Sequence, residues 1–204
     1  LGRLNEEQRA LLAVASVEGE TFTAQVVAEV QELDDRTVLQ TLAQDLSDQH
    51  RLVREQGEIS ADGRYLTQFA FAHALFREHL YREMSQGVRR LLHGEVAETL
   101  ETLYGEENQR IVPQLAHHFD HAGRNEKAIE YTVRAGDFAR KTYANDQAKR
   151  HYKRALTLLG TISPSETIRH WHLMALSGLG KLYYNTGSMP EAVRYLREAI
   201  ALGK

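Results

Sequence analysis

Apolar side chains recur with the period of an α-helix over roughly the first fifty residues of the chain. Three helices are predicted from this pattern: one at about 5–17, a second that begins at Thr23, and a third from Asp34 to Arg51. Gly19 ends the first helix, while Thr23 and Asp34 are of residue types that cap helix N-termini. The residues expected on the inward faces of these helices are Leu4, Gln8, Leu11, Leu12, Ala15, Val26, Val27, Val30, Leu33, Val38, Leu39, Leu42 and Leu46.

The pattern changes to a period of two after Leu52. Asp62 and Gly63 form a turn dipeptide, and beyond it Tyr65, Phe69 and other apolar residues alternate along the chain. A two-stranded β-hairpin with an aromatic face is therefore predicted. Three helices followed by such a ribbon is the element order of a winged helix, a helix-turn-helix variant.

The rest of the chain is predicted to be helical. Two linking helices are expected between His73 and Gly105, followed by helices at about 109–122, 125–143, 145–159, 165–186 and 189–202. The last two match the tetratricopeptide pattern, in which a Leu-Gly pair and a tyrosine on one helix meet small residues on its partner. Here these residues are Leu179, Gly180, Tyr183, Ala192 and Ala199, of which Gly180 and Ala192 would allow close helix packing.

A weaker form of the repeat precedes this unit. Two frames share the helix predicted at about 125–143, and S-x-x-E sequences at 163–166 and 188–191 are expected to cap the last two helices. The fold predicted is mainly α, with a winged-helix-like domain at 1–72, linking helices at 73–105 and a tetratricopeptide-like α-solenoid at 106–204.

Composition and charge narrow the class of protein. The chain is 42% hydrophobic and 26% charged and contains no cysteine, so a globular fold without disulfides or thiolate metal sites is expected, in a reducing, cytoplasmic setting. No apolar run is long enough to predict a membrane span. The net charge is −7 in residues 1–72 and +4 in residues 73–204. Because DNA-reading helices need basic side chains, the acidic third helix predicts that the winged helix does not bind DNA.

The sequence carries no motif of a known catalytic chemistry. A phosphate-binding G-x-x-x-x-G-K-[ST] loop, G-x-G-x-x-G and G-x-S-x-G are all missing. We predict that this segment is not an enzyme and has no cofactor. His117 and His121 are spaced to share a metal ion, but no zincin-type glutamate follows His117, and we predict no metal site. His118 is expected to pack inside the repeat, with its two neighbours facing solvent.

Two surfaces are candidates for partner binding. The concave face of a tetratricopeptide array is its usual peptide groove, and the residues expected on it are Lys181, Tyr184, Asn185, Arg140, Lys141, His117, Asp120 and His121. A basic stripe on the helix at 145–159 is formed by Lys149, Arg150, Lys153 and Arg154. This stripe is either an ordinary solvated face or a contact for an acidic or phosphate-bearing partner.

Short motifs are distributed over nearly the whole chain. They are residues 11–19 with Phe22, then 51–53, 71–75 with Arg77 and Glu78, 104–105, 115–119, 122–123 and 143–145. In this order they resemble the segment that follows the nucleotide-binding module of bacterial STAND ATPases, the signal-transduction ATPases with numerous domains. That family includes predicted ATPases fused to class III adenylate or guanylate cyclases and large LuxR-type transcription activators.

The resemblance implies a regulatory role. In such proteins the winged helix is an arm that holds the ATPase closed, and the repeats sense an inducer or bind partners. The ATPase module is missing from this sequence, so the resemblance assigns no hydrolysis and no catalytic residue, although the parent chain is expected to carry an ATPase or a cyclase. A polar capping helix is also missing at Lys204, so the parent chain is expected to continue.

The first expectation for function is therefore a non-catalytic regulatory and protein-interaction segment of a larger signal-transduction or transcription-regulatory ATPase. Its partners would be a protein or peptide and, within the parent chain, the missing ATPase module, with no membrane contact. Two alternatives stay open. One is a nucleic-acid-binding module that uses the basic residues at 140–154, and the other is a small-ligand sensor in the solenoid groove.

Overall fold

The computed structural model describes residues 4–105 and 109–203 and is mainly helical. The chain divides into two compact units, Leu1–Glu107 and Asn108–Lys204. Within the described ranges, no helix is both long enough and apolar enough to cross a membrane.

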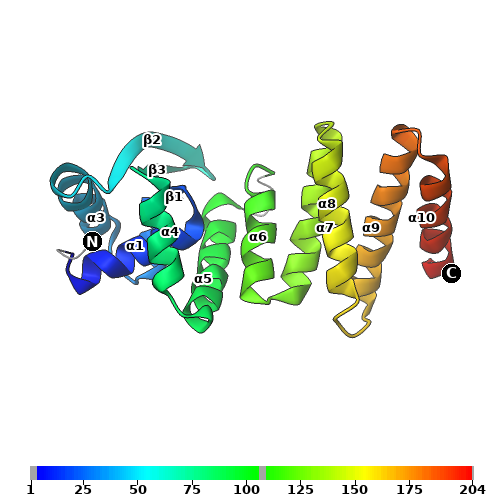
Figure 1. Cartoon of the computed structure of the whole chain (residues 1–204), viewed down its shortest axis with the longest axis horizontal. Coiled ribbons are helices and arrows are strands. Elements are labelled where there is room, and N and C mark those ends of the chain that lie inside the picture. The colour runs from blue at the N-terminus through cyan, green and yellow to red at the C-terminus, as the bar shows by residue number, and fades with distance from the viewer. Residues whose placement is uncertain (1–3, 106–108, 204) are drawn as a thin grey trace. The chain divides into compact units, whose positions relative to one another are not determined.

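The first unit combines helices with one small sheet (Figure 1). Its elements are α1 (Glu6–Glu18), β1 (Thr21–Thr23), α2 (Ala24–Val30), α3 (Asp35–Gln40), the π-helical segment η1 (Thr41–Gln49), β2 (Val53–Ala61), β3 (Arg64–Phe71), α4 (Ala74–Glu83) and α5 (Gln86–Tyr104). The strands form an antiparallel sheet in the order β1-β3-β2. Helices α4 and α5 pack against α1, and α5 also packs against α2.

The helices predicted at the start of the chain are present, with different ends. α1 begins at a capping box in which Asn5 accepts from the backbone N–H of Gln8. Thr23 occupies the N-cap of α2 without a side-chain hydrogen bond, whereas Asp34 caps α3 by accepting from the N–H of Thr37 at 3.0 Å. The predicted third helix is not a single α-helix, because α3 continues directly into η1.

The predicted hairpin is confirmed, but its aromatic face is shorter than expected. The turn between β2 and β3 has positive φ at Asp62 and Gly63, the backbone of a tight hairpin turn. Phe69 is fully buried and stacks on Phe22 at 6.0 Å. The prediction that Tyr65 belongs to this face is wrong, because Tyr65 lies close to the turn and is 75% exposed.

Residues 109–203, the described part of the second unit, form helices and no strands. They are α6 (Val112–Ala122), α7 (Asn125–Lys141), α8 (Asn145–Leu159), α9 (Glu166–Asn185) and α10 (Met189–Leu202). Each helix packs against the next along the chain, and α7 also contacts α9 (Figure 1). The helices predicted in this region are confirmed. They could be predicted because the apolar stripe of each helix is long and regular.

Glycines set the spacing between these helices. A Cβ on Gly136 would lie 2.7 Å from the Tyr152 ring, and one on Gly180 would lie 2.6 Å from Leu196. Real Cβ atoms essentially never come this close to other atoms, so any larger residue would force the facing side chain to shift. The large side chains on α8 and α10 therefore rest directly on the backbones of α7 and α9, as the small-residue pattern predicts for Gly180.

The predicted caps of the last two helices are only partly formed. Ser165, rather than Ser163, is the N-cap of α9 and accepts from the N–H of Ile168 at 3.2 Å. Ser188 occupies the N-cap of α10 but makes no side-chain hydrogen bond. Pro190 in the first turn of α10 needs no intrahelical partner for its nitrogen, which favours a helix start at this point.

Candidate functional site

The C-terminal turn of α9 carries three exposed side chains that differ in chemistry. Lys181, Tyr184 and Asn185 are all exposed, and the tyrosine is 60% exposed. Their spacing of i, i+3 and i+4 places them on one face of the helix. A cation, an aromatic ring and an amide are thus presented together to solvent.

Two basic residues lie at the same end of the unit. Short connections reverse the chain between consecutive helices, so α7 and α9 run in the same direction (Figure 1). Arg140 and Lys141 end α7, which contacts α9. We define the α7–α9 end surface as Arg140, Lys141, Lys181, Tyr184 and Asn185. The exposed cations Lys141 and Lys181 and the exposed ring of Tyr184 suit an anionic group attached to an apolar one.

Arg140 is fixed in place by Tyr152 and Asp137. Its Nε donates to the Tyr152 hydroxyl at 3.4 Å, and its Nη2 lies 3.3 Å from Asp137 Oδ1. The Tyr152 hydroxyl in turn donates to Asp137 at 2.7 Å. The hydrogen bond to Tyr152 is the main cause that raises the pKa of Arg140, while burial is the main cause that raises the pKa of Tyr152. The guanidinium therefore stays charged and oriented.

The candidate residues on α6 have a different setting. Arg154 binds both carboxylate oxygens of Asp120, at 2.7 and 2.8 Å, and this raises the pKa of Arg154. The acidic charge of Asp120 is thus neutralised within the protein. His117 and His121 are exposed with ring centres 4.1 Å apart, while His118 is fully buried, as predicted.

The four basic residues of the stripe on α8 do not share one environment. Arg154 faces Asp120 across the helices, and Lys149 lies over the ring of Tyr183, with its Nζ 5.1 Å from the ring centre. Arg150 and Lys153 are exposed. The stripe therefore offers less accessible charge than the four basic residues of the sequence suggest.

Two stacked tyrosine rings and a lysine side chain connect the last three helices. Tyr183 on α9 stacks on Tyr195 on α10, with ring centres 5.6 Å apart. Lys149 covers one side of this pair, and the guanidinium of Arg194 lies 4.4 Å from the ring centre of Tyr195. These ring contacts stabilise the packing of α8, α9 and α10 in the second unit.

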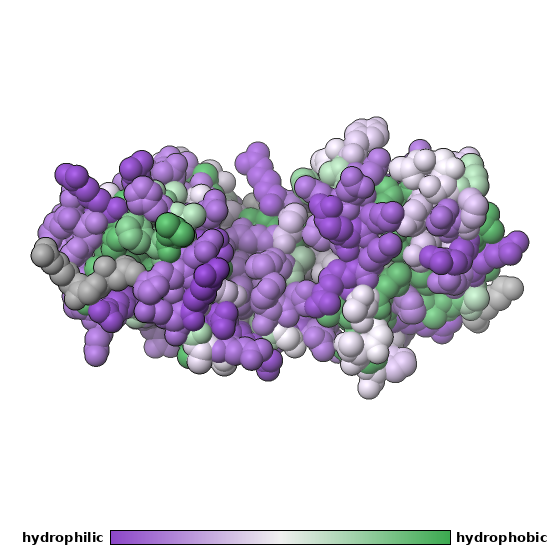
Figure 2. Space-filling view, in the orientation of Figure 1, coloured by the Kyte–Doolittle hydropathy of each residue, from purple (hydrophilic) through white to green (hydrophobic). Residues whose placement is uncertain are grey.

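Hydrophobic surface is also exposed on α9 and α10. Figure 2 shows green residues over these helices, next to purple and pale ones, and a further green area over the first unit. Met174, Val193 and Ile200 are 37%, 46% and 62% exposed. These exposed apolar side chains lie outside the α7–α9 end surface.

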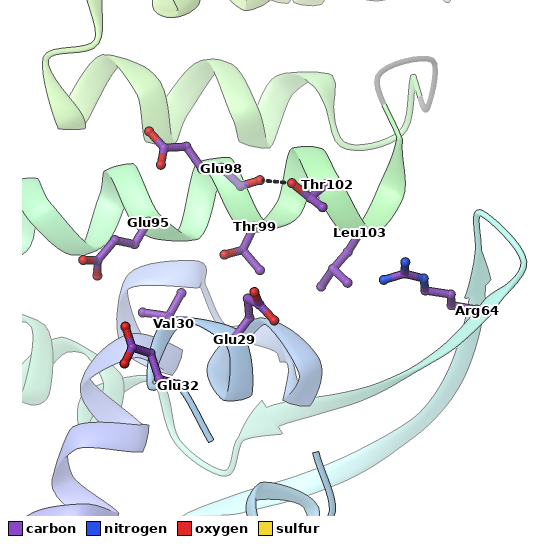
Figure 3. A pocket seen from close by; sticks show the side chains of 9 residues that line it. All are labelled: Glu29, Val30, Glu32, Arg64, Glu95, Glu98, Thr99, Thr102 and Leu103. Atoms are coloured by element: carbon purple, nitrogen blue, oxygen red, sulfur yellow. Dashed lines mark hydrogen bonds between the residues drawn. The ribbon is translucent and has the colours of Figure 1, made fainter. Parts of the chain in front are cut away.

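The first unit contains a pocket that the sequence did not predict (Figure 3). The acidic pocket is a cavity of about 400 Å³ whose charged and polar lining includes Glu29, Glu32, Arg64, Glu95, Glu98 and Thr99. Pairs of glutamates spaced i, i+3 occur in the sequence, but nothing in it shows that residues of α2 and α5 face one another.

Comparison with known proteins gives little information on function. An uncharacterized protein of Rhizobium meliloti (strain 1021) is 29% identical to this chain over 133 residues. The aligned region covers 65% of this chain and 13% of that protein, so the chain spans a small part of the relative it matches. No protein family and no solved structure matches the chain.

Proposed function

We propose that this chain is a non-catalytic regulatory and protein-interaction segment of a larger bacterial signal-transduction ATPase of the STAND kind. The first unit contains a winged helix that acts as a regulatory arm, and the second is a tetratricopeptide-like solenoid that binds a protein or peptide. The match to a small part of a much longer bacterial protein supports the view that such segments occur in larger chains.

The topology of the first unit supports a winged helix. Helix α1, strand β1, helices α2 and α3 with η1, and the β2–β3 hairpin follow one another along the chain, and β3 lies between β1 and β2. Positions 34, 35, 45 and 48, in and next to α3 and η1, are aspartates. A helix so acidic favours contact with protein rather than with DNA.

Close helix packing supports the tetratricopeptide-like assignment. Gly136 and Gly180 receive large side chains from the following helix, and Ala192 is 1% exposed. These are the small positions of the repeat pattern. The shared use of α7 by two repeat frames is consistent with its contacts to α6, α8 and α9.

The α7–α9 end surface is the observation that carries the proposed interaction. Residues 108–204 contain 15 Lys/Arg and 8 Asp/Glu, a net charge of +7, whereas residues 1–107 contain 10 and 20, a net charge of −10. A basic unit with an exposed tyrosine among cations suits an acidic peptide, since tyrosine supplies apolar contact and the cations bind carboxylates.

Changing Lys181 and Tyr184 together to alanine is expected to weaken binding without unfolding the protein. Both side chains are exposed, so the stability change should stay within about 0.5 kcal/mol. Affinity for a peptide with an acidic C-terminus, selected from a library against the wild-type chain, should fall about tenfold or more. Fluorescence anisotropy measures the affinity, and thermal melting measures the stability.

A matched control is the double change Arg197→Ala and Ile200→Ala. It removes one exposed cation and one exposed apolar side chain from α10, outside the α7–α9 end surface. Peptide affinity should stay within about twofold of wild type, because peripheral contacts contribute little. Equal losses in the two double variants would contradict the assignment of this surface.

A nucleic-acid-binding module is the second candidate, and the net charge of +7 in residues 108–204 favours it. We nevertheless expect no duplex DNA shift in a gel at about 0.15 M salt, because Arg154 is paired with Asp120, Lys149 lies over Tyr183, and residues 1–107 repel phosphates. A shift at this salt concentration that is lost on changing Arg150 and Lys153 to glutamine would favour the second candidate instead.

A further inference from the structure

A carboxyl group is buried in the first unit without a cation to pair with it. Glu18 ends α1 and is 7% exposed. The backbone N–H of Thr23 donates to both of its carboxyl oxygens, at 3.1 Å each, and the two side chains are also hydrogen-bonded. Among the described residues, no ion pair includes Glu18. Because an unpaired charge in a protein interior is costly, this site favours the neutral carboxyl group.

Thr23 links this carboxyl group to the end of α5. Thr23 is 1% exposed, ends β1 and is the N-cap residue of α2. Its hydroxyl lies 3.4 Å from the hydroxyl of Tyr104, the last residue of α5, which is 9% exposed. We define the Glu18 cluster as Glu18, Thr23 and Tyr104. Through this cluster, the ends of α1 and β1 and the start of α2 are connected to the last turn of α5.

The described elements that pack against α1 supply no counter-ion to Glu18. α1 contacts α2, α4, α5 and β1. On α4, Arg77 donates from Nε to the Ser16 carbonyl at 3.2 Å. β1 has no titratable side chain, and the one that α2 contains is another acid, Glu29. On α5, burial is the main cause that raises the pKa of Tyr104, and the charge of Glu18 raises it further. Ionised Glu18 would therefore face an acid and a phenol rather than a cation.

Burial decides the protonation of Glu18. Burial is the largest cause that raises the pKa of this carboxyl group, to about 8, and the hydrogen bonds from Thr23 lower it only in part. Two donors from one residue replace a small part of the water that a carboxylate binds. Ionisation of Glu18 thus favours any conformation in which water reaches the carboxylate.

The last turn of α5 is the part of the cluster that is easiest to move. β1 is held from below by Phe22, which is fully buried and stacks on Phe69. Tyr104, by contrast, lies at a helix end, and helix ends open at a lower free energy than the core of a domain. Detaching this turn removes the Tyr104 side chain from the cluster and lets water reach Glu18.

We propose that the Glu18 cluster is a pH-sensitive switch, in which neutral Glu18 and Thr23 hold the last turn of α5 in place and ionisation of Glu18 releases that turn while the rest of the first unit stays folded. The released turn directly precedes the boundary between the two units, at Glu107 and Asn108. The switch lies in the first unit and does not depend on peptide binding by the second.

Native-state hydrogen exchange of the ¹⁵N-labelled full chain, followed by NMR from pH 5 to 8, tests this proposal. The protection factor of the Tyr104 amide should fall by up to about tenfold per pH unit, because opening releases one proton. It should not change at low urea concentrations, since a local opening exposes little surface. The amide of Val96, which is fully buried in the middle of α5, should lose protection as urea is added. The same urea dependence at both residues would mean global unfolding and would overturn the proposal.

Three variants separate the switch from an ordinary buried hydrogen bond. Glu18→Gln cannot ionise, so protection at Tyr104 should no longer depend on pH. Glu20→Gln, at an exposed position two residues away, should keep the wild-type fall. Tyr104→Phe removes the hydroxyl that meets Thr23 and should lower protection at residue 104 several-fold at pH 5. A pH dependence in Glu18→Gln equal to that of wild type, or unchanged protection in Tyr104→Phe, would contradict the switch.

The protonation of Glu18 can also be followed directly in the wild-type chain. In a ¹³C NMR titration, the Glu18 carboxyl resonance should change at a higher pH than those of the exposed glutamates, and the Tyr104 amide shift should change with the same midpoint. A Glu18 resonance that titrates together with the exposed glutamates would overturn the proposal.

Discussion

Replacing Gly178 with alanine is expected to lower the free energy of unfolding by about 2–3 kcal/mol, the cost of overpacking a core. The new Cβ would lie 2.7 Å from the hydroxyl oxygen of Tyr152 and closer still to its ring. Tyr152 is fully buried and its hydroxyl is bound to Asp137, so the ring has no room to move away. Urea unfolding followed by circular dichroism measures the effect.

Gly87→Ala is the matched control for this change. Gly87 lies in the first turn of α5, where the nearest side-chain atom to a new Cβ would be 4.0 Å away. Alanine there should be neutral or should stabilise the protein by up to about 1 kcal/mol, because glycine is the poorer helix former. Adding Tyr152→Leu to Gly178→Ala should recover part of the loss. If Gly178→Ala and Gly87→Ala have the same effect, α8 does not rest on the backbone of α9.

The stability of the first unit should fall as the pH rises from about 4.5 to about 8. Burial raises the pKa of Glu18 from 4.5 to about 8, and hydrogen bonds from Thr23 offset this only in part. Between these values the folded state holds a proton that the unfolded state has lost, so raising the pH favours unfolding. At about 1.4 kcal/mol per pKa unit, the contribution is on the order of 5 kcal/mol.

Glu18→Gln should remove this pH dependence. Glutamine is neutral at every pH, so the variant should be more stable than wild type at about pH 9 and similar to it near pH 4.5. Glu20→Gln, at an exposed position two residues away, should keep the wild-type profile. Urea unfolding across this pH range gives both profiles, and a Glu18→Gln variant with the wild-type slope would show that Glu18 is not the responsible group.

The helices of the second unit could be predicted from sequence because their apolar stripes are long and because Gly123 and Gly187 lie where helices end. Strand β1 could not, because three residues are too few to show a period of two. The change from α3 to η1 also leaves no clear trace in the apolar pattern. Hydrogen bonding at Ser188 depends on local backbone geometry, which the S-x-x-E pattern does not specify.

The candidate sites could also be predicted from the sequence only in part. Exposure of Lys181 and Tyr184 follows from their positions on a helix whose other face is buried. The ion pair between Arg154 and Asp120 joins residues 34 positions apart, and no pattern in the sequence indicates it. The acidic pocket requires that α2 packs against α5, which is a property of the tertiary structure. Sequence reasoning thus locates exposed residues on one helix better than sites formed by several.

An NMR titration of the ¹⁵N-labelled chain with the selected acidic peptide tests the central claim most directly, because it locates the contact residue by residue. We predict that the largest amide shift changes occur at Arg140, Lys141 and residues 181–185 and saturate with one affinity. Changes that instead concentrate on residues 149–154, or that scatter over the chain without saturation, would contradict a partner-binding role for the α7–α9 end surface.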